Sequence, residues 1–328
     1  MIDTTPVSCN SLGKYFHVNG KHLEEQYIRY LSDFPEWDQF DHASDWILFP
    51  DNIGENLSID ETSLSLGELY TVITNKAAKG KKGALVAMIK GVESNNVSSI
   101  LKKIPKRKRD KVKEVTLDMA ASMQKIVSSC FPNAKQVTDR FHVQQLAYDA
   151  LQDIRIAHRW EAIEQENNEI ELCKEVGKEY VPNVLKNGDT LKQLLARSRY
   201  LLFKHENKWT ASQHQRAEIL FGYYPDLKKA YDLCRELGSI YEKTNDKGVA
   251  FTRLAQWYDK VEKAGFKTFN TLSRTIQNHY LRILNYFDNR STNASAESFN
   301  AKIKAFRSQF RGVKNIPFFL FRLSNIYA

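Results

Sequence analysis

The chain lacks the long apolar runs that mark membrane spans and secretion signals. No stretch of its 328 residues approaches about 18 consecutive apolar side chains. The N-terminus carries Asp3 and has no apolar run, so it does not resemble a signal peptide. We therefore expect a cytoplasmic protein without a membrane partner.

Cysteine is scarce, and its spacing excludes two other classes. The four cysteines are widely separated, and none forms a Cys-x-x-Cys or Cys-His pair suited to structural zinc. We interpret them as ordinary reduced thiols. The sequence also contains no internal repeat and no low-complexity linker. Its 42% hydrophobic and 27% charged residues are typical of a globular protein.

Basic residues are in excess, and two segments concentrate them. The chain has 48 Lys and Arg against 39 Asp and Glu, a net charge of +9, and a pI near 9.1. Residues 102–113 hold eight basic residues and one acid, and six basic residues but no acid follow Glu297. This distribution favours a polyanionic partner, although a solvated surface would explain the charge equally well.

Residues 57–143 alternate short β-type runs with turns and helical patterns. Strands are expected at residues 57–64, 69–74 and 84–89, then a helix at 97–104, a strand at 112–117, a helix at 119–130 and a strand at 135–138. The first three strands form a meander, and the last two flank a helix, which implies a right-handed parallel crossover. This order predicts an α/β fold with a ribonuclease-H-like mixed sheet.

The remaining segments complete a four-part organisation. Residues 1–56 form a small N-terminal region of uncertain role, in which residues 22–30 could make a short helix. Residues 57–143 are the first part of the core. Residues 144–290 have apolar side chains at helical spacings and predict a large all-helical insertion. Residues 291–328 return to the core with a helix at 294–306 and a turn at 311–312. One domain with a large insertion and two separate domains both fit this length.

Two acidic residues occupy related positions in the predicted sheet. Asp60 lies within the first strand and Asp118 at the end of the fourth. Because these strands are neighbours in the predicted order, both carboxylates can converge at one end of the sheet. Carboxylate oxygens are the ligands that Mg²⁺ prefers. Taken singly, each Asp is more often a cap or turn residue.

Two further groups of residues could complete such a site. Glu297, Asn300 and Lys304 share one face of a predicted helix by their spacing of three and four. Asp139 and His142 follow the fifth strand and are close enough to share a hydrogen bond. His142 could contact a phosphate or orient a water molecule. A surface helix and a structural histidine are the plainer interpretations.

Together these elements resemble the DDE transposases of bacterial insertion sequences, in the group related to the Mutator and hAT elements. The resemblance covers residues 57–328. It rests on Ile-Asp-Glu-Thr at 59–62, Leu-Asp-Met-Ala at 117–120, Phe-Pro-Asn-Ala-Lys-Gln-Val-Thr-Asp-Arg-Phe-His-Val at 131–143, and the segment from Glu297 to Asn315. In that family a long helical insertion separates the second acid from the third.

The resemblance implies roles for the acidic residues. Asp60, Asp118 and Glu297 would bind Mg²⁺ or Mn²⁺, while Asp139 and His142 match an auxiliary Asp-x-x-His signature. Asp139 also ends a strand and remains an alternative second acid. Asp118 is preferred because its strand should adjoin that of Asp60.

The implied function is metal-dependent cleavage of DNA at mobile-element ends followed by strand transfer into target DNA. Backbone phosphates would be held by polar and basic residues of two segments, namely Lys102, Lys103, Lys106, Arg107, Lys108, Arg109, Asn300, Lys302, Lys304, Arg307 and Arg311. Synapsis of two ends implies a homodimer associated with the nucleoid. A non-catalytic DNA-binding protein and a structure-specific nuclease on the same fold are the alternatives.

The sequence departs from fuller family members in its N-terminal part. These usually begin with a zinc-binding and helix-turn-helix region that recognises the terminal inverted repeats, and residues 1–56 contain no zinc ligand set. Recognition of the ends could therefore come from a separate polypeptide, from the helical insertion or from the basic segments.

Overall fold

A computed structural model describes residues 1–64, 67–310 and 313–328. The described chain divides into two compact units. We call residues 1–139 together with 289–328 the sheet unit, and residues 140–288 the helical unit. None of the described helices combines the length and the apolar character that crossing a bilayer requires.

The described part of the sheet unit contains one mixed sheet of six strands in the order β1-β4-β3-β2-β5-β6. The strands are β1 (Trp46–Leu48), β2 (Asn56–Ser63), β3 (Leu69–Asn75), β4 (Leu85–Lys90), β5 (Glu114–Leu117) and β6 (Lys135–Thr138). Strands β1, β4, β3 and β2 pair antiparallel, whereas β5 is parallel to both β2 and β6. The predicted meander and parallel crossover are confirmed.

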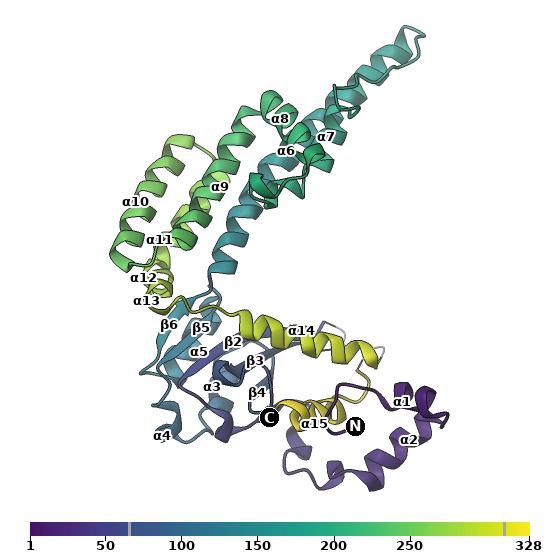
Figure 1. Cartoon of the computed structure of the whole chain (residues 1–328), viewed down its shortest axis with the longest axis vertical. Coiled ribbons are helices and arrows are strands. Elements are labelled where there is room, and N and C mark those ends of the chain that lie inside the picture. Colours follow the sequence, from purple (N-terminus) through teal and green to yellow (C-terminus); the bar gives the residue numbers. More distant parts are fainter. Residues whose placement is uncertain (65–66, 311–312) are drawn as a thin grey trace. The chain divides into compact units, whose positions relative to one another are not determined.

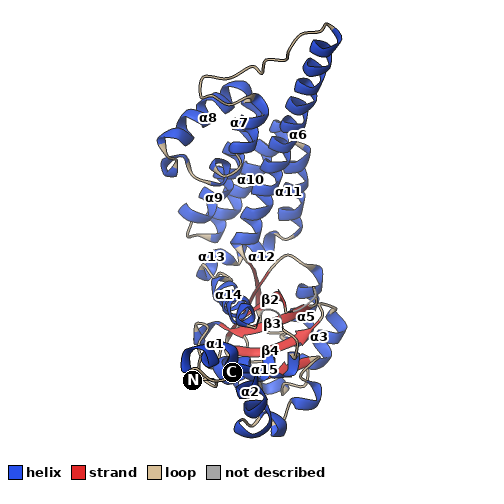
Figure 2. Cartoon of the chain, turned by 90° about the vertical axis from the view of Figure 1, so that its right-hand side faces the viewer, coloured by secondary structure: helices blue, strands red, loops and turns tan. Residues whose placement is uncertain are grey.

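Helices cover both faces of this sheet (Figure 2). The helices of this unit are α1 (Cys9–Phe16), α2 (Gly20–Gln26), α3 (Ser94–Leu101), α4 (Lys106–Arg109), α5 (Ala121–Cys130), α14 (Ala294–Gln309) and α15 (Ile316–Tyr327). Apolar residues of β2 that point one way, Leu57 and Ile59, pack with α3 and α5. Val72 and Met88 point the other way and pack with α14 and α15.

Helix α14 is held on the sheet by a stripe of buried side chains. Phe299, Ile303 and Phe306 recur at helical spacing and are fully buried. Burying each contributes about 1.5–3 kcal/mol relative to an exposed side chain. Residues before 139 and after 289 therefore share one core, although the whole helical unit separates them in the sequence (Figure 1).

The described residues of the helical unit form no strand. Its helices are α6 (Arg140–Glu175), α7 (Leu191–Arg197), α8 (Ala211–Tyr223), α9 (Pro225–Lys243), α10 (Lys247–Ala264), α11 (Lys267–Asn278) and α12 (Tyr280–Leu284), and α13 (Tyr286–Asn289) ends just past its boundary. Its core side chains include Leu254, Trp257 and Val261 of α10. The aromatic and apolar spacing noted in the sequence is thus core packing.

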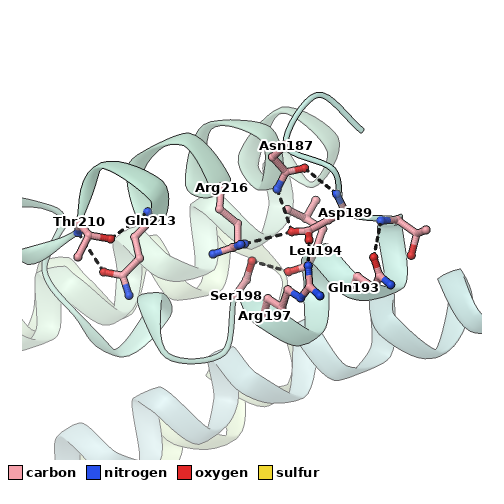
Figure 3. A network of polar contacts seen from close by, with 10 residues as sticks. Asn187, Asp189, Gln193, Leu194, Arg197, Ser198, Thr210, Gln213 and Arg216 are labelled. Atoms are coloured by element: carbon pink, nitrogen blue, oxygen red, sulfur yellow. Dashed lines mark hydrogen bonds and ion pairs between the residues drawn. The ribbon is translucent and has the colours of Figure 1, made fainter. Parts of the chain in front are cut away.

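A buried carboxylate organises the connection into α7 (Figure 3). Asp189 is 1% exposed and accepts hydrogen bonds from Arg197, from Arg216 Nε at 3.2 Å and from Asn187 Nδ2 at 2.8 Å. The turn reaches this position because Gly188 adopts a φ of +81°, which glycine tolerates without cost.

A reciprocal Thr210–Gln213 capping box starts α8.

Candidate active site

Three aspartates lie in one row across adjacent parallel strands. The β2–β5 register pairs Ser58 with Thr116, and Asp60 and Asp118 each lie two residues further along the chain from that pair. The β5–β6 register pairs Leu117 with Thr138, so the next position aligns Asp118 with Asp139. Partners in a parallel pair point to the same face, and neighbouring strands are about 4.8 Å apart. The predicted adjacency of the strands of Asp60 and Asp118 is confirmed, and β6 with Asp139 lies one strand further away.

Helix α14 contacts this row directly. The Nδ2 atom of Asn300 donates to Oδ2 of Asp60 at 2.7 Å and to the carbonyl of Glu61 at 3.3 Å. The other oxygen of Asp60 accepts from the backbone N–H of Glu61 at 2.8 Å. Both oxygens of Asp60 therefore have a donor, which fixes the plane of the carboxylate.

Glu297 lies on the same helix, one turn before Asn300. Residues three apart on a helix have Cβ atoms about 5–6 Å apart. The structure thus brings the helix of Glu297 onto the strand of Asp60, across 237 positions of sequence. The Glu297 side chain is exposed, whereas Asn300 is 7% exposed.

The carboxylates of the row raise the pKa of a neighbouring acid. Burial raises the pKa of Glu61 above 4.5, and the negative charges of Asp118 and Asp60 raise it further. Asp118 is itself fixed, because its Oδ1 accepts from the backbone N–H of Ala120 at 2.9 Å. Negative charge is therefore concentrated at the end of β5, where Asp118 lies. Such an environment attracts cations.

The chemistry of these side chains fits a hard divalent ion. In the described ranges, no three His, Cys, Asp or Glu side chains are close enough to hold a metal between them. Mg²⁺ commonly binds through one or two carboxylates and completes its shell with water and substrate phosphates. The aligned pair of Asp60 and Asp118 supplies that number of ligands.

Asp139 and His142 fall on either side of the boundary between the units. Asp139 is 1% exposed and donates its backbone N–H to the carbonyl of Leu117 at 3.0 Å. His142 belongs to the first turn of α6, where its ring packs edge-on against Phe141. Their shared hydrogen bond and auxiliary role stay predictions.

The first basic segment lies at the opposite end of the strands from the aspartate row. It leads into the start of β5, while Asp118 follows the end of that strand. Arg109 donates to the carbonyls of Ile104 and Cys130 at 3.0 and 2.7 Å, and Lys108 pairs with Asp51. Four of the predicted phosphate ligands remain exposed, namely Lys102, Lys103, Lys106 and Arg107.

The second basic segment is divided between structural and exposed side chains. Lys302 donates to the carbonyl of Gly80 at 2.7 Å, and Arg307 donates to the carbonyl of Ser63 at 2.9 Å. Lys304 is exposed on the side of α14 that carries Asn300. Arg311 and the expected turn at Arg311 and Gly312 lie outside the described residues.

Comparison with known proteins identifies the family. Residues 57–323 match the profile of a transposase family, the DDE transposases of the ISL3 type. The chain belongs to this transposase family. It is also 20% identical over 273 residues to the transposase for insertion sequence element IS1001 of Bordetella parapertussis, a match covering 82% of this chain and 60% of that protein. The chain thus spans about three fifths of that relative. No solved structure matches it.

Sequence analysis of this transposase-family chain missed three residues near the row. Glu61 directly follows Asp60 in the Ile-Asp-Glu-Thr segment, but the sequence pattern predicts no role for it. Lys76 and Glu114 form a largely buried ion pair at 3.5 Å, and Lys76 also donates to Thr116, two residues before Asp118. Lys76 follows a strand without any recognisable motif, so only the three-dimensional contacts identify it.

Proposed function

We propose that this chain is the catalytic part of a transposase that cleaves DNA at mobile-element ends and joins the freed ends to target DNA. One observation carries the proposal. Asp60 and Asp118 each lie two residues past a paired position of the adjacent parallel strands β2 and β5, and the helix that bears Glu297 is hydrogen-bonded to Asp60 through Asn300. Family membership supplies the reaction class.

In this proposal Asp60, Asp118 and Glu297 hold Mg²⁺ or Mn²⁺. A divalent ion bound there would polarise the phosphodiester and lower the pKa of the attacking water. Asn300, predicted to bind phosphate, would instead orient Asp60, because its buried amide is already bonded to that carboxylate. Hydrolysis breaks a phosphodiester bond and leaves a 3′-hydroxyl. That hydroxyl then attacks a target phosphorus atom and displaces the 3′-oxygen of the target strand.

The finer relationships also belong to this proposal. Along the chain, the elements follow in the order β2-β3-β4-α3-β5-α5-β6. This order supports a ribonuclease-H-like core, which the helical unit interrupts as an insertion. The Asp-Arg-Phe-His sequence at 139–142 supports an auxiliary role for Asp139 and His142 and a relation to Mutator and hAT transposases. Asp118 is the proposed second acid because β5, and not β6, adjoins the strand of Asp60.

DNA contacts and partners follow from the same reaction. The exposed Lys304 and the four exposed residues of the first basic segment would bind backbone phosphates without reading sequence. Cleavage of two ends in one complex implies a homodimer that acts at the nucleoid. Because the chain spans 60% of its IS1001 relative, a separate polypeptide or segment could recognise the terminal repeats.

Incubation with labelled DNA that carries the inverted repeats flanking the gene tests this proposal. We expect nicks at the repeat boundary that require Mg²⁺ or Mn²⁺, followed by products in which labelled ends are joined to a target plasmid. DNA retention without breaks would instead support a binding protein. Breaks without joined products would support a nuclease on the same fold.

A further inference from the structure

Lys76 links three parts of the sheet unit, including the segment that leads into α14. It directly follows β3, and its side chain is 16% exposed. Its Nζ donates to Oγ1 of Thr116 at 2.9 Å and to the hydroxyl of Ser291. Thr116 lies two residues before Asp118, and Ser291 lies six residues before Glu297. One ammonium group therefore bridges the lead-in segments of two proposed metal ligands.

An adjacent carboxylate extends this contact to the chain where it re-enters the sheet unit. Glu114 pairs with Lys76 at 3.5 Å and accepts from Nδ2 of Asn289 at 3.4 Å. Asn289 is the first residue of the returning segment. The next residue, Arg290, has a φ of +51°, a conformation that costs a non-glycine residue about 1–3 kcal/mol and persists only where its surroundings hold it.

The segment between this re-entry point and α14 also contains a buried polar side chain. Asn293 is fully buried, and neither atom of its side-chain amide has a hydrogen-bond partner in the described part of the chain. On the sheet, the hydroxyls of the paired residues Ser58 and Thr74 are also buried without a partner. Glu114 and Lys76 therefore tie two residues of this segment, Asn289 and Ser291, to the sheet.

We propose that Lys76 is a positioning residue that clamps the returning segment to β5 and thereby sets where α14 presents Glu297 to Asp118. This inference rests on the proposed function of those two acids. Residues 289–293 lead directly into α14, so fixing them to β5 limits where the helix can begin along β2. A misplacement of about 1 Å at a reacting centre can cost about 10²-fold in rate.

The buried ammonium group of Lys76 has compensating partners. Burial lowers the pKa of Lys76, and the negative charges of Glu114 and Asp139 oppose that effect. A buried ammonium group is stable only when it is paired and hydrogen-bonded. Lys76 meets both conditions through Glu114, Thr116 and Ser291.

Hydrogen exchange of the full-length chain tests the clamp independently of any activity. In Lys76→Met, amides of residues 291–300 should exchange about tenfold faster, the change expected from losing one charge-assisted hydrogen bond. Amides of the β2–β3 ladder should keep their rates. Lys82→Met, which alters an exposed lysine after the same strand, is the matched control. Unchanged exchange at residues 291–300 would overturn the clamp. If Lys76→Met fails to fold, Ser291→Ala removes one bond only and decides the same question.

Mn²⁺ affinity then tests whether the clamp acts through Glu297. Lys76→Met should weaken Mn²⁺ binding about tenfold in the wild-type background and leave it unchanged in a Glu297→Gln background. Equal losses in both backgrounds would overturn the positioning role even if exchange is accelerated. A wild-type chain that neither binds Mn²⁺ nor cleaves DNA would contradict the proposed function. Hydrogen exchange would still decide whether the clamp exists.

Discussion

The two units surround acidic groups in opposite ways. In the helical unit, Asp189 is surrounded by the guanidinium groups of Arg197 and Arg216, so its charge is compensated. In the sheet unit, Asp60 and Asp118 each lie two residues past a paired position of β2 and β5, and their charges add to the burial that raises the pKa of half-buried Glu61. A compensated buried charge serves the fold. Like charges held together by the fold are common at functional sites.

The units also differ in how the chain builds them. The helical unit is one continuous segment, residues 140–288, whereas the sheet unit needs both ends of the chain. Because the charges of the aspartate row repel one another, substitutions there should reduce activity with little loss of stability. Substitutions at Asp189, whose charge is compensated, should lower stability and leave the chemistry unchanged.

Asp118→Asn gives the largest expected effect. Loss of one proposed metal ligand should reduce metal-dependent DNA cleavage by about 10³-fold or more, since metal coordination contributes several kcal/mol to transition-state stabilisation. The Tm should stay the same or rise slightly, because one of two neighbouring negative charges is removed. Cleavage rates and thermal unfolding measure the two effects. Asp51→Asn, at an exposed position of the same unit, should cleave like the wild type. An active Asp118→Asn protein would transfer the role of second acid to Asp139.

Asp189→Asn tests the other side of the comparison. The substitution leaves two arginines without their shared carboxylate and should cost the helical unit roughly 2–4 kcal/mol, reduced from the fully buried case because Arg197 is half exposed. Hydrogen exchange in α7 and α8 should accelerate, while the β2–β3 ladder keeps its protection. Asp232→Asn breaks an exposed pair with Lys228 and should cost less than about 0.5 kcal/mol. Equal effects of the two substitutions would contradict the structural role of Asp189.

Asn300→Ala has an intermediate expected effect. Removing the amide releases one oxygen of Asp60, and residues that orient a metal ligand typically contribute about 10–100-fold to metal affinity or activity. Gln309→Ala, at an exposed position on the same helix, is the control. A cleavage rate within twofold of wild type for Asn300→Ala would show that Asp60 needs no support from α14.

His158→Gln should have the smallest effect, and it depends on pH. Burial lowers the pKa of His158, but its hydrogen bonds to Glu161 and Asp226 outweigh burial and raise the pKa above 6.5. The stabilisation is therefore complete below pH 6.5 and is lost as the pH rises through the folded-state pKa. Thermal unfolding should show wild type exceeding His158→Gln by about 2 °C at pH 6 and by less at pH 8. A difference that grows with pH would reverse the sign of this linkage.

Much of the sheet could be predicted from the sequence, because β-branched runs and turn residues report local conformation directly. The strands of Asp60 and Asp118 were expected in their observed places, and residues 135–138 match β6. Strand β1 was missed because it has three residues and pairs only at an edge. Short edge strands carry too little periodicity to be recognised.

The surroundings of the site were harder to predict. Asn300 shares a helical face with Glu297 and Lys304, so the sequence indicated a phosphate contact, whereas its burial against Asp60 depends on how α14 packs. Lys76 contacts Ser291 across 215 positions. No pattern within one segment reports a contact of that separation.

The central claim is that Asp60, Asp118 and Glu297 form one metal site. Crystals of the chain bound to element-end DNA, soaked with Mn²⁺ and measured at the Mn absorption edge, test it most directly. We expect an anomalous peak within about 2.0–2.3 Å of carboxylate oxygens from all three residues. A peak that excludes Asp60 and Asp118, or one that Glu297 does not approach, would contradict the account.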